Sequence, residues 1–209
     1  FAREPEILRF LSGYFGPYPF RAAGGIVDAD GEWDYALENE SRPIYTPQDF
    51  RTQAGGDSVV VHELTHQWYG DSVSVEHWQD IWLNEGFATY AEWLWSDVSG
   101  GASVDAMAAQ WYRRLSSLPA TIRLADPGVR YMFDERVYKR GGVMLHALRR
   151  RLGDVAFFRL LRDWAGANRH STVTTEAFLE TAERFADESL GEFFTQWLFD
   201  AALPRLRGQ

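Results

Sequence analysis

The spacing of apolar residues predicts a chain that mixes helices and strands at first and is helical afterwards. In "PEILRFLSGYF" (5–15) apolar residues recur every three or four positions, and Gly16 and Pro17 end the predicted helix. The same period over 58–69 and 84–97 predicts two further helices. "GGIVDADGEWDYALEN" (24–39) has extended apolar pieces around an Asp-Ala-Asp-Gly turn, which predicts strand, turn, strand.

After "SGGAS" (99–103) the pattern is helical nearly to the end of the chain. Ser189 and Glu192 have the spacing of a capping box for the last of these helices. We therefore expect an α+β fold, with a small mixed β-sheet lobe over 1–100 and an all-helical lobe over 101–209. The helices expected in the second lobe cover residues 104–117, 140–152, 155–166, 175–186 and 190–200.

Composition excludes several classes of protein. The net charge of −9 argues against binding to nucleic acid or to an anionic membrane surface. The absence of cysteine excludes disulfides and thiolate metal sites. No apolar run approaches the roughly 20 residues of a membrane span, and no signal peptide is visible, so we expect a cytoplasmic protein. Because the chain begins with Phe1 rather than Met, we expect a fragment of a longer protein.

The stretch "HELTH" (62–66) carries the first chemical signal. Residues four apart share one helix face, so His62 and His66 can reach the same metal ion. Glu63 lies about 100° around the helix axis, beside the ligand pair, where a carboxylate can act as a base. The alternative is two histidines that share this spacing by chance.

A catalytic zinc site needs three protein ligands and one open position. Of the remaining histidines, His77, His146 and His170 have no partner at helical spacing, so each is interpreted as a surface or core residue. Glu85 begins the next predicted helix, 19 residues after His66, and two crossing helices can bring its carboxylate to the ion. We therefore predict a zinc site formed by His62, His66 and Glu85.

Four strings in order resemble the zinc aminopeptidases of the alanyl aminopeptidase and leukotriene hydrolase type, which are gluzincins. They are "HELTHQWYGD" (62–71), "WLNEGFA" (82–88), "ALEN" (36–39), similar to that family's Gly-Ala-Met-Glu-Asn, and "VYKRGGVML" (137–145), similar to its Val-Tyr-x-Lys-Gly. The sequence departs from the family pattern with Tyr35 for Gly, Leu37 for Met, Asp71 for Asn and Arg140 for Lys.

The resemblance implies a fold and a reaction. The fold is a thermolysin-like catalytic domain that holds one zinc ion, and in relatives it follows an N-terminal β-rich domain. Glu63 would deprotonate the attacking water, and Tyr138 would stabilise the oxyanion. Glu38 would bind the free α-ammonium group of a peptide substrate, with Ala36, Leu37 and Asn39 along the substrate backbone. From sequence alone, the favoured interpretation of Tyr138 is a half-buried packing tyrosine, and that of Glu38 is a solvated loop acid.

Glu92 is a further candidate, because it follows Glu85 by seven residues and so shares its helix face. From there it can accept the second ring N–H of a liganding histidine, and Asp80 is a weaker candidate for the same role. The alternative for Glu92 is a plain surface acid. For the whole chain, two other functions stay open beside a zinc aminopeptidase: a gluzincin endopeptidase and a non-catalytic zinc- or peptide-binding relic.

Overall fold

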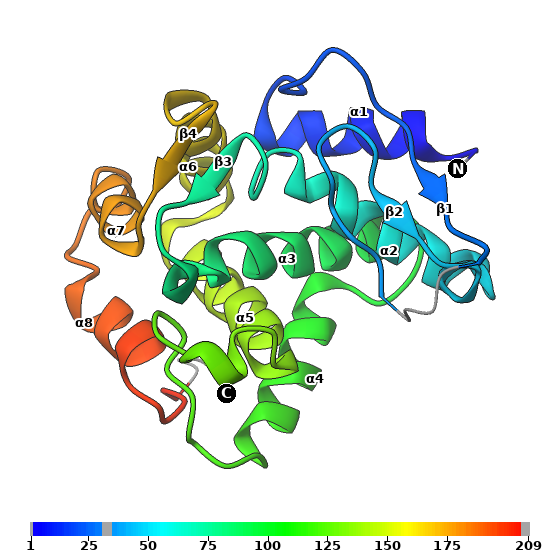
Figure 1. The fold of residues 1–209 in the computed structure, drawn as a ribbon. Coiled ribbons are helices and arrows are strands. Elements are labelled where there is room, and N and C mark those ends of the chain that lie inside the picture. The colour runs from blue at the N-terminus through cyan, green and yellow to red at the C-terminus, as the bar shows by residue number, and fades with distance from the viewer. Residues whose placement is uncertain (1, 31–34, 206–209) are drawn as a thin grey trace.

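The computed structural model describes residues 2–30 and 35–205, and these form an α+β fold that is mostly helical. Figure 1 shows α3 and α5 at the centre of the molecule, with α1 and α2 on one side and α6 and α7 on the other. The helices are α1 Glu4–Phe15, α2 Gln53–His66, α3 Trp82–Val98, α4 Val104–Ser116, α5 Glu135–Leu152, α6 Asp154–Ala167, α7 Thr175–Glu183 and α8 Gly191–Phe194. The strands are β1 Ile26–Val27, β2 Ile44–Tyr45, β3 Val73–Val75 and β4 Ser171–Val173.

Two helices that carry site residues begin five residues earlier than the apolar pattern predicts, because polar side chains cap them. The Thr52 hydroxyl accepts a hydrogen bond from the backbone N–H of Gly55 at 3.1 Å, which starts α2 at Gln53. The Asp134 carboxylate accepts from the N–H of Arg136 at 3.0 Å, which starts α5 before Tyr138. Each capped extension adds polar residues that the apolar period does not detect.

The predicted strand, turn, strand over 24–39 is corrected by the structure. Strand β1 pairs in parallel with β2, and Ile26 lies opposite Ile44. Of the piece predicted as the second strand, the described residues form one antiparallel bridge, between Leu37 and Ile44. The end of the predicted turn lies outside the described residues. Strand β2, which follows "ALEN", lies between β1 and Leu37, because Ile44 pairs with residues on both sides. Since β1 and β2 run parallel, they cannot be the two arms of a hairpin.

The second part of the chain is not purely helical, contrary to the prediction. Strand β4 pairs in parallel with β3, and Val73 lies opposite Ser171 (Figure 1). The strand has only three residues, Ser171, Thr172 and Val173, which is too short to show a strand period, and its partner strand is distant in the sequence. Buried apolar side chains from Ile7 to Leu198 form one cluster, so both parts of the chain share a single core.

The end of the described chain also differs from the prediction. Helix α8 continues as a π-helical turn over Thr195–Phe199. The capping box is not formed: the N-cap residue is Leu190, and the Glu192 carboxylate accepts from the Gln196 side chain at 3.0 Å. Among the described residues no helix has both the length and the apolar content that crossing a membrane requires.

Buried Arg140 on α5 ties this C-terminal segment to the core. Its guanidinium donates hydrogen bonds of 2.6 to 3.3 Å to six backbone carbonyls, five of them within residues 196–202 and the sixth at Ile122. A π-helical turn leaves carbonyl groups without partners in the helix, and the planar fork of an arginine can satisfy several at once. The residue that replaces the lysine of the family pattern is thus a structural cap.

Helices α3 and α5 touch through their backbones. A Cβ atom added to Gly141 would lie 2.7 Å from the Cα of Gly86, and one added to Gly86 would lie 3.0 Å from the Cα of Gly141. Side chains at either position would separate the helices. Glu85 and Tyr138 precede these glycines by one and three residues, so the contact brings both toward the same place.

Candidate metal and peptide site

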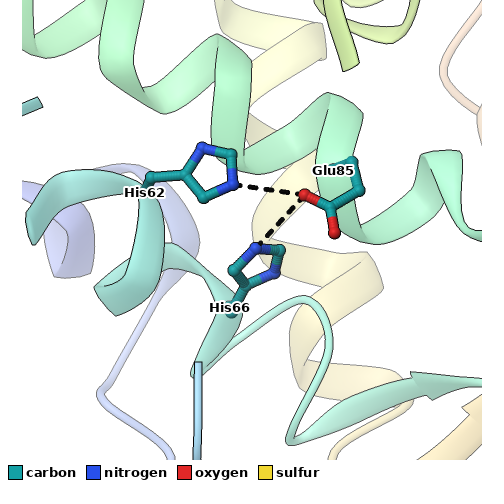
Figure 2. Close-up of side chains that lie close together, drawn as sticks. All are labelled: His62, His66 and Glu85. Atoms are coloured by element: carbon teal, nitrogen blue, oxygen red, sulfur yellow. Dashed lines mark hydrogen bonds and ion pairs between the residues drawn. The ribbon is translucent and has the colours of Figure 1, made fainter. Parts of the chain in front are cut away.

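Three predicted metal ligands converge between the last turn of α2 and the first turn of α3. One donor atom from each of His62, His66 and Glu85 lies within 4.8 Å of the other two. Figure 2 shows both imidazole rings directed at the same carboxylate oxygen. That oxygen, Oε2 of Glu85, is 3.2 Å from Nε2 of His62 and 3.4 Å from Nε2 of His66.

The other nitrogen of each ring fixes its tautomer. Nδ1 of His62 is 2.7 Å from Oε1 of Glu92, and Nδ1 of His66 is 3.0 Å from the backbone carbonyl of Tyr69. Both partners only accept hydrogen bonds, so Nδ1 carries the proton in each ring and Nε2 faces Glu85. Two imidazole Nε2 atoms and one carboxylate oxygen, with their outer partners in place, match the donor set of a catalytic zinc ion.

The electrostatics of the three groups favour a cation between them. Burial opposes charge on Glu85, yet the pKa of its carboxyl lies well below the usual range because His66 and His62 interact with it. Burial likewise opposes charge on His66, but the attraction of Glu85 outweighs it and raises the pKa of that imidazole to about 9. A metal ion bound at the Nε2 atoms would replace these ring protons, since metal binding releases them.

Glu63 lies beside this group and is nearly fully buried, with 6% of its surface exposed. Burial raises the pKa of its carboxyl to about 7, against the opposing influence of His62 and His66. A carboxylate whose pKa lies near neutral pH can accept a proton and release it again at similar cost, which is the property of a general base.

A cleft of about 240 Å³ opens over these residues. Eight of the ten residues predicted for the site line it. Leu37 and Asn39 do not, because both are exposed, and the Asn39 carbonyl accepts from Gln67 at 3.4 Å. The structure adds Tyr35, Asp49 and Val59. The cleft is lined by Tyr35, Ala36, Glu38, Asp49, Val59, His62, Glu63, His66, Glu85, Glu92 and Tyr138.

Nothing in the local sequence identifies Asp49 as a site residue. It belongs to a 3-10 turn, where its carboxylate accepts from the backbone N–H of Thr46 at 2.7 Å, and this is the ordinary role of such a residue. Its place in the cleft arises only because this turn packs beside α2 in the folded chain.

Tyr138 is half-buried, and its ring stacks on that of His62, with centroids 6.0 Å apart and an angle of 17° between the planes. Burial raises the pKa of its phenol, and the charges of Glu85 and Glu38 raise it further. The hydroxyl therefore keeps its proton at neutral pH and can donate a hydrogen bond into the cleft.

Glu92 contacts three residues with one carboxylate. Oε1 accepts from His62, Oε2 accepts from the Ser58 hydroxyl at 2.7 Å, and Nζ of Lys139 lies 3.9 Å from Oε1. Asp80, the weaker candidate, lies elsewhere: it is buried, and its Oδ1 accepts from the Thr175 hydroxyl at 2.6 Å.

The remaining histidines stay outside the group. His146 is buried and lies 3.1 Å from Asp105 through Nε2, whereas the side chains of His77 and His170 are exposed. The prediction that these three are core or surface residues agrees with their positions.

Comparison with known proteins gives a consistent picture. The model of the Peptidase family M1 domain matches residues 4–197. Endoplasmic reticulum aminopeptidase 1 of Homo sapiens is 32% identical over 171 residues, which cover 72% of this chain and 18% of that protein. Probable aminopeptidase 2 of Sulfurisphaera tokodaii is 29% identical over 164 residues, or 70% of this chain and 20% of that protein. The chain thus spans about a fifth of the length of these relatives.

Solved structures agree with the sequence matches. The M1 zinc metallopeptidase from Deinococcus radiodurans has a TM-score of 0.86 at 37% identity, over 97% of this chain and 45% of that one. Native yeast LTA4 hydrolase has a TM-score of 0.80 at 20% identity, over 97% of this chain and 35% of that one, and this likeness concerns the fold alone.

Proposed function

Because the chain belongs to peptidase family M1, we propose that it is the catalytic part of a zinc-dependent aminopeptidase with a thermolysin-like fold. The observation that carries this proposal is the joint presence, in one cleft, of the His62, His66 and Glu85 group, the base Glu63 and the carboxylate of Glu38. The relatives that match this chain are aminopeptidases, and the similar structure from Deinococcus radiodurans is a zinc metallopeptidase.

One zinc ion would be held by His62, His66 and Glu85. Bound there, it would supply a Lewis acid for the scissile carbonyl and lower the pKa of a water molecule toward about 7. The chain's own part in this arrangement is orientation: Glu92 and the Tyr69 carbonyl hold the two rings so that Nε2 faces the third ligand.

Glu63 acts as the general base. Its carboxylate takes a proton from the attacking water and then delivers that proton to the amine nitrogen of the departing peptide. Its burial and near-neutral pKa suit both transfers. Removal of this carboxylate should therefore abolish turnover while leaving the three metal ligands intact.

Tyr138 donates a hydrogen bond to the carbonyl oxygen as negative charge develops on it. A single donor of this kind contributes about 3 kcal/mol to transition-state stability, or about a hundredfold in rate. This role is supported by the stacking of its ring on that of His62 and by the place of both residues in the lining of the cleft.

Glu38 binds the α-ammonium group of the substrate. An ammonium ion that leaves water needs a charged partner, so a carboxylate in the cleft selects peptides with a free N-terminus and disfavours acylated ones. Among the described residues that line the cleft, none is Lys or Arg, so no lysine or arginine side chain in the cleft competes for Glu38. Ala36 lies along the same wall, where the substrate backbone would pass.

The experiment that tests this function is mass spectrometry of one peptide, free and N-acetylated, after incubation with zinc-loaded protein. We expect the free peptide to lose single residues from its N-terminus, the acetylated peptide to survive, and Glu63→Gln to cut neither. Internal cleavage of both peptides would instead identify an endopeptidase. If protein with one zinc per chain cuts neither peptide, the same test on a longer chain separates a truncated enzyme from a non-catalytic relic.

A further inference from the structure

Gln67 does not line the cleft but lies buried behind it, next to a metal ligand in the sequence. It follows His66 directly at the C-terminal end of α2, and none of its surface is exposed. Its Oε1 accepts from the backbone N–H of Ser41 at 2.6 Å and from the Tyr18 hydroxyl at 3.3 Å. Ser41 precedes Gln67 by 26 residues, so this side chain joins two segments that are distant in the sequence.

The Nε2 group of Gln67 donates to the same segment and to a fixed acceptor. It lies 3.1 Å from the backbone carbonyl of Glu38, 3.4 Å from that of Asn39 and 2.7 Å from Oδ2 of Asp71. The orientation of the amide is determined, because the Ser41 N–H can only donate and a carboxylate and two carbonyls can only accept. A flipped amide would lose four of these five bonds.

The segment that Gln67 holds is strained. Ser41 has φ +58°, in the left-handed region that favours glycine. A non-glycine residue keeps this conformation only where its surroundings impose it. The hydrogen bond from the Ser41 N–H to Gln67 is one such restraint, and the N–H of Arg42 closes the turn onto the Asn39 carbonyl at 3.0 Å.

We propose that Gln67 is a positioning residue that sets the distance between Glu38 and the metal ligands. Gln67 is covalently linked to His66, and its side chain hydrogen-bonds to the backbone of Glu38. One buried side chain, held by several hydrogen bonds, therefore connects the amine-binding residue to the metal group. The proposal rests on the proposed function, because it assumes that Glu38 binds the substrate ammonium. It predicts that Gln67 governs the preference for a free N-terminus without binding substrate or metal.

The test measures binding, so it does not depend on turnover by this chain. Isothermal titration of zinc-loaded protein with leucine amide and with N-acetyl-leucine amide gives a ratio of dissociation constants. Every protein titrated, the wild-type reference included, carries Glu63→Gln so that leucine amide is not hydrolysed. We expect wild type to bind the free amine at least about tenfold more tightly, because a buried ion pair is lost in the acetylated compound. Gln67→Met removes the hydrogen bonds at similar volume and should reduce the ratio to about threefold or less. Zinc should remain at one ion per chain.

Three comparisons make the outcome decisive. Gln110→Met, an exposed glutamine on α4, should keep the wild-type ratio. Glu38→Ala should bring the ratio to about one, and a wild-type ratio already near one would overturn the amine-binding part of the proposed function itself. If Glu38→Ala abolishes the preference while folded Gln67→Met keeps it, the positioning role is wrong and the proposed function stands.

A purely structural role for Gln67 would lower the unfolding temperature of Gln67→Met and leave the ratio unchanged. If Gln67→Met does not fold, Asp71→Ala serves in its place, because it removes the acceptor that orients Nε2 and leaves the glutamine present. We expect its ratio to fall about threefold, and an unchanged ratio would overturn the proposal.

Discussion

The contact between Glu92 and His62 gives the most direct prediction about metal affinity. In Glu92→Gln, the amide oxygen can still accept from Nδ1 of His62 at the present 2.7 Å, and the amide nitrogen can donate to the Ser58 hydroxyl, which can rotate to accept. The substitution therefore preserves the hydrogen bonds and removes only the negative charge. Glu92→Ala removes both.

The magnitude follows from the kind of hydrogen bond that is lost. A bond to a charged group contributes about 1.5–3 kcal/mol and a neutral one about 1 kcal/mol, so the charge is worth roughly 0.5–2 kcal/mol. The positive charge of Lys139 would weaken zinc binding further in Glu92→Gln. Its ammonium group lies 3.9 Å from Oε1 of Glu92, and without that carboxylate its charge would no longer be balanced near the metal site. We expect Glu92→Gln to weaken zinc binding about 3- to 30-fold and Glu92→Ala about 100-fold.

The assay is competition for zinc against a chromophoric chelator at pH 7.5, with thermal unfolding of the zinc-free protein as the folding control. Glu180→Gln, an exposed residue on α7, is the matched control and should bind zinc like wild type. A dissociation constant for Glu92→Gln within twofold of wild type, in protein that unfolds normally, would refute the argument that this carboxylate supports the metal ligand.

Three predictions concern stability. Gly141→Ala should lower the free energy of unfolding in urea by about 1–2 kcal/mol, since the clash with Gly86 exceeds the gain of about 1 kcal/mol in helix propensity; a more stable variant would contradict the close contact. Arg140→Met should cost about 3 kcal/mol or more, because buried carbonyls lose their donor, and a loss under about 1 kcal/mol would show that water replaces it. Burial raises the pKa of Asp71 to about 7, so the folded zinc-free state binds more protons than the unfolded state between about pH 4 and 7. Its stability should fall as pH rises through that window, and Asp71→Asn should flatten this fall; an equal slope in both proteins would contradict the assignment.

The helices and the metal group could be predicted from the sequence because their signals are local or nearly so. The apolar period identified α1, α3, α4 and α6 to within two residues at each end, since their buried faces are continuous. His62 and His66 share one turn of helix, and Glu85 follows after a connection short enough to bring two helices together. The structure brings these three side chains together as the spacing suggested.

Other features depended on contacts between distant segments, which no local pattern reveals. Strand β4 owes its conformation to β3, which lies about a hundred residues earlier. The role of Gln67 depends on the turn at Glu38 and Ser41, so the residue itself gives no signal in the sequence. The helix starts at Gln53 and Glu135 were missed because single capping residues set them, outside the apolar period.

The glycine contact between α3 and α5 has a consequence for how this site can change. Because Gly86 and Gly141 meet backbone to backbone, the thickness of the main chain fixes the separation of Glu85 from Tyr138 as long as both residues stay glycine. A methyl group at either position would move the two helices apart by about 1 Å, and a displacement of that size can cost about a hundredfold in rate. A substitution at Gly86 or Gly141 should therefore abolish catalysis even where the protein still folds. Stabilising substitutions elsewhere should restore the stability of such a variant but not its activity.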